Sequence, residues 1–178
     1  MKIFLIGING KMGRAICDAA EQSGVTVAGG IDVSGEGRYK VFRSAAEVDV
    51  DFDCIIDFSR PAALGDVIAL ARRTKKPAVI ATTGYTDEQL AEIKALSSEV
   101  PVFRSANMSV GVNVVESVLP MLAKALKGFD VEIVEAHHNR KVDAPSGTAL
   151  QMLAAVESGL DYDPRIVYGR QGESKREK

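Results

Sequence analysis

The sequence predicts an α/β protein built on a doubly wound parallel sheet, with a smaller α+β domain after it. Short apolar runs alternate with helix-like runs from Lys2 to Arg104, which is the order that gives parallel strands with helical crossovers. The first apolar run, Lys2 to Ile6, leads straight into a glycine turn and then into a helix-like segment. These observations favour a Rossmann-like first domain.

The later elements repeat this alternation. Further strand-like runs are Val25 to Ile31, Cys54 to Phe58, Ala78 to Thr82 and Val100 to Arg104. Helix-like runs are Arg14 to Ser23, Pro61 to Arg73 and Thr86 to Leu96. The polar residues 34 to 49 predict a loop with a short turn of helix.

The second domain begins where a polar Asn-x-Ser turn runs into an apolar helix, from Asn107 to about Lys127. A strand is predicted over Asp130 to Ala136, and a helix begins near Ala149. We therefore expect a first domain over residues 1–106 and an incomplete second domain over 107–178.

Composition excludes several classes of protein. A net charge of −2 gives no electrostatic reason to expect nucleic acid, and the opening apolar run is too short for a signal peptide or a membrane span. The two cysteines, Cys17 and Cys54, suggest neither a disulfide framework nor a CxxC site. A protein of the reducing cytoplasm is expected.

The glycine turn has the spacing of a dinucleotide site. Residues Gly7 to Gly13 read GINGKMG, with Asn9 where the standard fingerprint has its second glycine. Gly7 and Gly10 allow the backbone to approach a pyrophosphate at a helix N-terminus, and Gly13 allows close packing of helix on strand. A tight turn without a ligand is the alternative.

Asp32 ends the second predicted strand, about where a carboxylate accepts hydrogen bonds from an adenosine ribose. Because no arginine follows Asp32 directly, NADH is expected at least as much as NADPH. Arg38 and Lys40 keep NADPH open. The loops 58–60, 82–84 and 105–107 also follow strands, so they gather at the same edge of the sheet.

The segment Glu135 to Thr148, EAHHNRKVDAPSGT, concentrates polar chemistry on one connection. His137 and Lys141 can transfer protons, while residues 146–148 open a helix N-terminus that would bind a carboxylate. The alternative is a capped helix after a solvated loop. A zinc site is disfavoured, because His137 and His138 are adjacent and point to opposite faces of an extended chain.

The motifs GINGKMG, IDFSRP, ATTGYT, SANMSVGVN and EAHHNRKVDAPSGTA resemble those of the 4-hydroxy-tetrahydrodipicolinate reductase (dihydrodipicolinate reductase) family of bacterial lysine biosynthesis, over essentially the whole chain. The resemblance implies reduction of a cyclic imine dicarboxylate by NADH or NADPH in a homotetramer. It implies His137 as the acid/base histidine and Lys141 as the proton donor. Substrate contacts are expected from His138, Ser146, Gly147 and Thr148.

The cofactor contacts expected from the loops and from the resemblance are Gly7, Ile8, Asn9, Gly10, Lys11, Met12, Asp32, Phe58, Ser59, Ala81, Thr82, Thr83, Ser105, Ala106, Asn107 and Met108. Ala81 stands where the family commonly has glycine. No metal site is expected.

The residues after Tyr168 resemble an internal loop of the family, so we expect a piece of a longer protein. Two other interpretations stay open. One is a truncated dinucleotide-binding module without turnover. The other is a different two-domain dehydrogenase for an aspartate-derived metabolite, which would not need His137, His138 and Lys141 in this spacing.

Overall fold

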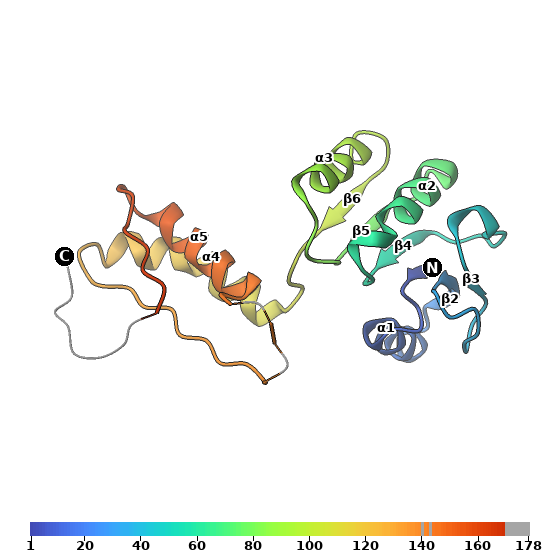
Figure 1. Ribbon diagram of the computed structural model, residues 1–178, viewed down its shortest axis with the longest axis horizontal. Coiled ribbons are helices and arrows are strands. Elements are labelled where there is room, and N and C mark those ends of the chain that lie inside the picture. Colours follow the sequence, from blue (N-terminus) through green and yellow to red (C-terminus); the bar gives the residue numbers. More distant parts are fainter. Residues whose placement is uncertain (140, 143, 170–178) are drawn as a thin grey trace. The chain divides into compact units, whose positions relative to one another are not determined.

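The computed structural model describes residues 1–139, 141–142 and 144–169. The chain forms two compact units, Met1–Met108 and a second that begins at Ser109 (Figure 1). Each unit has its own elements.

The first unit is built on a parallel sheet of six strands in the order β3-β2-β1-β4-β5-β6. The strands are β1 (Lys2–Ile6), β2 (Thr26–Ile31), β3 (Val41–Phe42), β4 (Cys54–Asp57), β5 (Ala78–Ile80) and β6 (Val102–Arg104). The strand order reverses between β1 and β4, which is the switch point where doubly wound sheets bind ligands. The predicted parallel sheet is confirmed.

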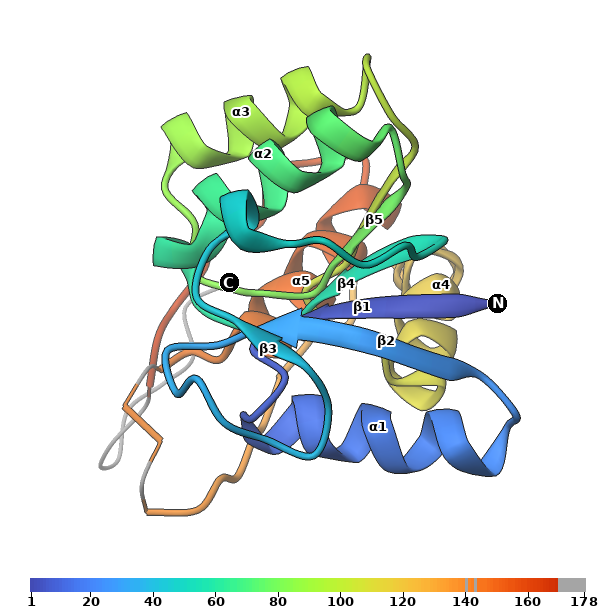
Figure 2. The same cartoon turned by 90° about the vertical axis from the view of Figure 1, so that its right-hand side faces the viewer.

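Helices cover both faces of this sheet. Helix α1 (Lys11–Gln22) lies on one face, and α2 (Leu64–Thr74) and α3 (Asp87–Leu96) lie on the other (Figure 2). Alternate side chains of β1 divide between the faces: Ile3 and Leu5 pack in the cluster that includes α1, and Phe4 and Ile6 pack in the larger core that includes α2 and α3. Two short 3-10 helices, η1 (Ala45–Glu47) and η2 (Pro61–Ala63), complete the unit.

One strand lies where the sequence predicts a loop. Residues Val41 and Phe42 form β3 and pair with Gly30 and Ile31 of β2. Two residues are too few to show a strand period, so only the neighbouring strand defines this element. The predicted short turn of helix in the same region is η1.

The second unit contains α4 (Val110–Ala125) and α5 (Gly147–Gly159), which pack against each other. Their contact is closest at Gly159, where a Cβ atom would lie 2.2 Å from the carbonyl oxygen of Pro120. No helix in the part of the chain that the structure describes is long and apolar enough to span a membrane.

The sequence predicts a strand over residues 130–136, and this prediction is wrong. The segment has no strand assignment, and both Val131 and Ile133 are exposed. A strand exists only with a hydrogen-bonded neighbour, and none of the described residues pairs with this segment. The alternating sequence pattern gives the segment strand character but cannot supply that neighbour.

Candidate functional site

The turn after β1 brings the end of a buried strand to the start of α1. Gly7 has φ +81, in the left-handed region that favours glycine. Its N–H donates to the carbonyl of Ile31 at 2.8 Å, and the N–H of Gly10 donates to the carbonyl of Gly7 at 3.0 Å. Helix α1 begins at the next residue, Lys11. The turn therefore presents the N-terminus of α1 at the switch point of the sheet.

Two of these glycines stand where a side chain would collide with backbone or with a neighbouring loop. A Cβ atom at Gly13 would lie 2.3 Å from the carbonyl oxygen of Gly7, and one at Gly7 would lie 3.1 Å from Cβ of Ser59. The turn is thus packed against α1 on one side and the loop after β4 on the other. This cradle fits the pyrophosphate of a dinucleotide, which needs close backbone approach and the positive end of a helix.

Asp32, at the end of β2, is held against the glycine turn. Its Oδ2 atom accepts the backbone N–H of Asn9 at 3.0 Å, and its Oδ1 atom accepts the backbone N–H and the hydroxyl of Ser34, both at 3.2 Å. The side chain is half-buried. The carboxylate therefore stands between the turn and the loop after β2, as a ribose-binding group must.

The loops after β4 and β5 are joined by a buried carboxylate that the sequence did not reveal. Asp57 is fully buried and accepts hydrogen bonds from the backbone and hydroxyl of Ser59 and from the hydroxyl of Tyr85, the last at 3.0 Å. Burial and the Asp57 carboxylate raise the pKa of Tyr85, so its phenol stays protonated and donates. The backbone N–H of Ser59 also donates to the hydroxyl of Thr82 at 2.9 Å.

The loop after β6 lies at the same edge of the sheet as the loops after β4 and β5. The N–H of Ser105 donates to the carbonyl of Ile80 at 3.2 Å, and the hydroxyl of Ser105 donates to the carbonyl of Asn107 at 2.7 Å. All predicted cofactor residues lie in the first unit, in the turn after β1, the first turn of α1 and the loops after β2, β4, β5 and β6. Of these, Ile8, Ala81 and Thr82 are buried, and the exposed ones include Met12 and Met108.

In the second unit, Glu135 connects His137 to the start of α5. One carboxylate oxygen accepts the backbone N–H of Ser146 at 2.8 Å, and the other lies 2.8 Å from Nε2 of His137. Hydrogen bonds from Ser146 and His137 lower the pKa of Glu135 to about 2, so the group is ionised at neutral pH. The arrangement fixes the imidazole beside a helix N-terminus.

Ser146 caps that helix. Its hydroxyl accepts the N–H of Ala149 at 3.1 Å, which leaves Gly147 and Thr148 in the first turn of α5. The backbone N–H of Lys141 donates to the carbonyl of His138 at 3.2 Å, forming a turn that carries both residues. Arg140 and Asp143 lie outside the described residues.

Glu135 was not predicted as a site residue. A signal was present, because residues two apart on an extended chain share a face, and Glu135 and His137 stand in that relation. The bond to Ser146 spans eleven positions and has no sequence signature. Asp57 was missed for the same reason, since its partner Tyr85 is distant along the chain.

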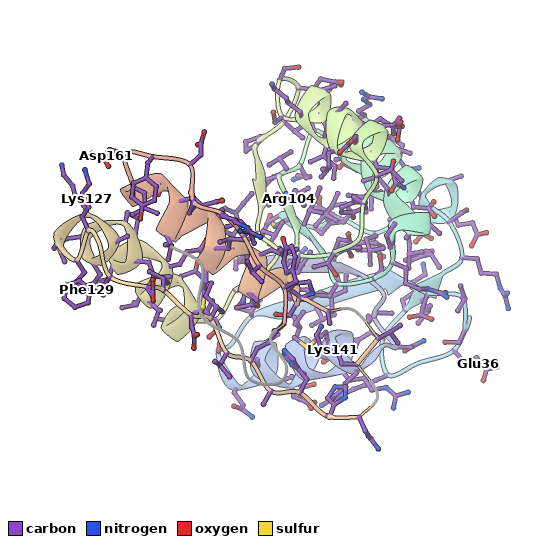
Figure 3. All side chains as sticks on the ribbon, turned by 60° about the vertical axis from the view of Figure 1, so that its left-hand side comes forward. Glu36, Arg104, Lys127, Phe129, Lys141 and Asp161 are labelled. Atoms are coloured by element: carbon purple, nitrogen blue, oxygen red, sulfur yellow. The ribbon has the colours of Figure 1, made fainter. Side chains whose placement is uncertain are left out.

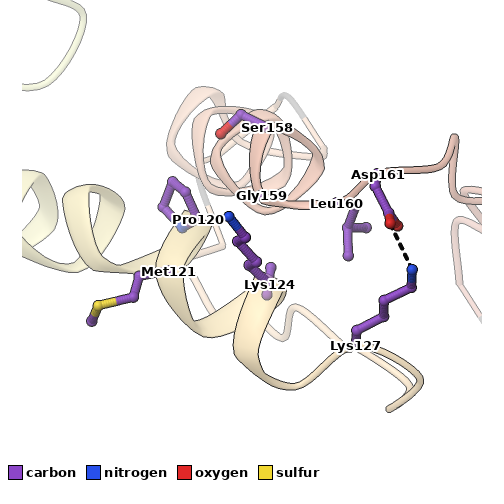
Figure 4. Close-up of a pocket in the computed structure, with 9 residues that line it drawn as sticks. Pro120, Met121, Lys124, Lys127, Ser158, Gly159, Leu160 and Asp161 are labelled. Atoms are coloured by element: carbon purple, nitrogen blue, oxygen red, sulfur yellow. Dashed lines mark hydrogen bonds and ion pairs between the residues drawn. The ribbon is translucent and has the colours of Figure 1, made fainter.

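A separate groove of about 500 Å³ lies between α4 and α5 (Figure 4). Its lining residues are Pro120, Met121, Ala123, Lys124, Lys127, Ser158, Gly159, Leu160 and Asp161. An ion pair of 2.6 Å between Lys127 and Asp161 stands at one side. None of the predicted site residues lines this groove. Among the described residues, no group of three or more His, Cys, Asp or Glu side chains could hold a metal ion.

Comparisons with known proteins find matches to both parts of the chain. The family model for dihydrodipicolinate reductase, N-terminus, matches residues 1–108, and the model for dihydrodipicolinate reductase, C-terminus, matches residues 111–178. The chain belongs to the dihydrodipicolinate reductase family. The predicted resemblance is thereby confirmed.

Relatives in this family are similar over the full length of the chain. A 4-hydroxy-tetrahydrodipicolinate reductase of Clostridium perfringens (strain 13 / Type A) is 42% identical over 100% of this chain and 72% of its own length. The reductase of the same name from Caldanaerobacter subterraneus subsp. tengcongensis is 41% identical over 100% of this chain and 72% of its own length.

Solved structures support the fold. The dipicolinate-bound dihydrodipicolinate reductase of Paenisporosarcina sp. TG-14 superposes with a TM-score of 0.74 at 24% identity, over 96% of this chain and 71% of that chain. An oxidoreductase of Agrobacterium radiobacter in complex with NAD+, L-tartaric acid and magnesium matches with a TM-score of 0.54 at 20% identity, over 70% of this chain and 41% of that chain.

Proposed function

We propose that the protein reduces 4-hydroxy-tetrahydrodipicolinate, a cyclic imine dicarboxylate, to tetrahydrodipicolinate with NADH or NADPH, in lysine and diaminopimelate biosynthesis. The observation that carries this proposal is the Glu135 carboxylate, which holds His137 and the N-terminus of α5 together within a chain of the dihydrodipicolinate reductase family. The relatives' names supply the reaction.

The first unit has the groups that a nicotinamide cofactor requires. The N-terminus of α1 and the glycine turn would bind the pyrophosphate, and Asp32 would accept hydrogen bonds from the ribose hydroxyls. The loops that Asp57 joins, together with the loop after β6, line the remaining part of the cofactor site. The bound cofactor supplies a hydride to the substrate.

The second unit supplies the substrate contacts and the proton. The backbone N–H groups of Gly147 and Thr148 and the imidazole of His138 bind a substrate carboxylate at the start of α5. Conversion of the 4-hydroxy substrate to tetrahydrodipicolinate consumes one hydride from the cofactor and one proton, and the 4-hydroxyl group leaves as water. The ammonium group of Lys141 donates that proton, and the imidazole of His137, oriented by Glu135, acts as acid and base.

The division of labour follows the chain: residues 1–106 bind the dinucleotide, and residues 107–178 bind and protonate the substrate. The family resemblance supports a cytoplasmic homotetramer. The two cysteines are free, as the reducing cytoplasm requires. The net charge of −2 and the composition give no reason to propose nucleic acid or a membrane as a partner. A module that only bound nucleotide would have no use for His137 and Lys141.

The experiment that tests this function separates turnover from cofactor binding. Lys141→Ala is expected to lower turnover of the imine by roughly 100-fold or more, because the proton donor is lost. Its affinity for NADH should not change, since the cofactor residues lie in the first unit. Steady-state rates and NADH fluorescence titrations measure the two effects.

The matched control is Lys127→Ala, which removes an exposed ammonium of the same unit that pairs with Asp161. It should leave turnover unchanged. Equal loss of turnover and NADH affinity in Lys141→Ala would refute the assignment of Lys141 as proton donor.

A further inference from the structure

Asn9 carries a side chain at a position where the dinucleotide fingerprint has glycine, and its amide nitrogen is hydrogen-bonded to the loop after β2. The two hydrogens of its amide nitrogen are shared among three acceptors: the backbone carbonyl of Ser34 at 3.2 Å, the hydroxyl of Ser34 at 2.8 Å and the carbonyl of Glu36 at 2.8 Å. Asn9 therefore ties the loop after β2, residues 34–37, to the glycine turn.

Residues 34–37 lie close to the side chain of Asn9 in the glycine turn. A Cβ atom at Gly37 would lie 2.5 Å from the side-chain oxygen of Asn9, so a larger residue there would displace the Asn9 side chain. The side chain of Glu36 points outward at the edge of the first unit, while its carbonyl accepts from Asn9 (Figure 3). The loop after β2 is where a ribose 2′-phosphate is accommodated when a dinucleotide carries one. In this chain the amide of Asn9 closes that loop onto the turn.

The carboxylate beneath the loop is fixed but still has acceptor capacity. Asp32 accepts the backbone N–H of Asn9 and two donors from Ser34. An ionised carboxylate can accept about four hydrogen bonds, so one further position is open to a ribose hydroxyl. A phosphate dianion at that point would meet a like charge instead.

The two cations that follow Asp32 in sequence are paired with other elements. The guanidinium of Arg38 forms ion pairs with Asp18, at 2.8 Å, and with Glu21, both on α1. The ammonium of Lys40 lies 2.5 Å from a carboxylate oxygen of Asp49. The loop does carry a nearby cation in Arg43, whose guanidinium nitrogen lies 3.1 Å from the position of a Gly35 Cβ.

We infer that Asn9 is a positioning residue that makes the site select a dinucleotide with a free ribose 2′-hydroxyl, NADH, over the 2′-phosphorylated NADPH. Asn9 acts through Asp32 and the closed loop 34–37. The inference rests on the proposed nicotinamide cofactor and deepens it by naming the preferred form.

The test is a pair of fluorescence titrations, NADH and NADPH, on the full chain and its variants, without imine substrate. The unaltered chain should bind NADH about fivefold more tightly or better, as expected for like charges about 4 Å apart in water. Asn9→Gly, which restores the fingerprint residue and releases the loop, should bring the two dissociation constants together. Asn9→Ser provides a second variant, and a thermal melt verifies that each variant is folded.

Arg38→Gln should leave NADPH affinity unchanged because Arg38 is paired with α1, and Lys40→Gln is its matched control. Equal or tighter binding of NADPH by the unaltered chain would overturn the inference while leaving the proposed function intact. Equal weakening of both nucleotides in Asn9→Gly would show a structural role and would also overturn it. Binding of neither nucleotide would remove the cofactor proposal, and the preference with it.

Discussion

Glu135 is the residue whose environment most directly links the structure to the proposed chemistry. It holds the imidazole of His137 and the first N–H of the α5 cap through its two oxygens. A carboxylate in this position fixes which ring nitrogen faces away from it, and it stabilises an imidazolium when one forms. The proposed acid/base role of His137 therefore depends on a residue outside the predicted site.

Replacement of Glu135 tests this dependence. Glu135→Gln should lower turnover by about tenfold or more and change the pH–rate profile, with NADH affinity unchanged. Glu157→Gln, an exposed change in the last turn of α5, is the control and should have no effect on turnover. A normal pH–rate profile in Glu135→Gln would contradict the positioning role.

The lowered pKa of Glu135 also predicts that the stability of the folded chain depends on pH. The folded-state pKa of Glu135 is lowered to about 2, mainly by Ser146 and then by His137. Its stabilising contribution is present above the ordinary glutamate pKa of about 4.3 and is lost as the pH falls towards 2. Between those values, the unaltered chain should lose stability faster than Glu135→Gln in denaturant titrations. Parallel pH dependences would contradict this.

The secondary structure could be predicted where a segment was long enough to show the apolar pattern of a strand or a helix. Strands β1, β2, β4 and β5 have apolar runs followed by turns, and α1 to α3 have clear helical spacing. The strand at Val41–Phe42 and the false strand at 130–136 show the limit of this reasoning, because pairing with a neighbour decides both. Pairing is a tertiary property that a local pattern does not contain.

The junction of β1 and α1 gives a prediction for these elements. Gly13→Ala places a Cβ atom 2.3 Å from the carbonyl oxygen of Gly7, so the helix must move away from the strand. We expect a loss of about 1–3 kcal/mol in the free energy of unfolding and weaker NADH binding. Chemical denaturation and nucleotide titration measure the two effects.

Gly65→Ala is the matched control for Gly13→Ala. Gly65 lies in α2, and a Cβ atom there would meet nothing within 4 Å. This variant should gain about 0.5–1 kcal/mol, as alanine does over glycine in a helix. If both variants behaved alike, the close packing of Gly13 would not be the cause.

At the scale of the whole molecule, the proposed function divides its chemistry between two units. The motifs gave candidates for both sets of residues, because turn and cap residues are local in sequence. The contacts that connect loops within each unit, through Asp57 and Glu135, were not predictable, since each bridges segments far apart along the chain. The family comparisons add the identity of the reaction.

This division predicts that damage to the second unit spares nucleotide binding. Gly159→Ala would place a Cβ atom 2.2 Å from the carbonyl oxygen of Pro120 and should destabilise the packing of α5 on α4 by about 1–3 kcal/mol. NADH affinity should stay the same, and turnover should fall. Gly111→Ala, where the nearest atom is 3.9 Å away, is the control. A loss of NADH affinity in Gly159→Ala would contradict the division.

The most direct measurement is oxidation of NADH and NADPH by this chain of 178 residues, with the imine dicarboxylate generated in situ. We expect turnover that disappears in a His137→Ala/Lys141→Ala double variant while nucleotide binding remains. Nucleotide binding without turnover in the unaltered chain would contradict the proposed reductase function.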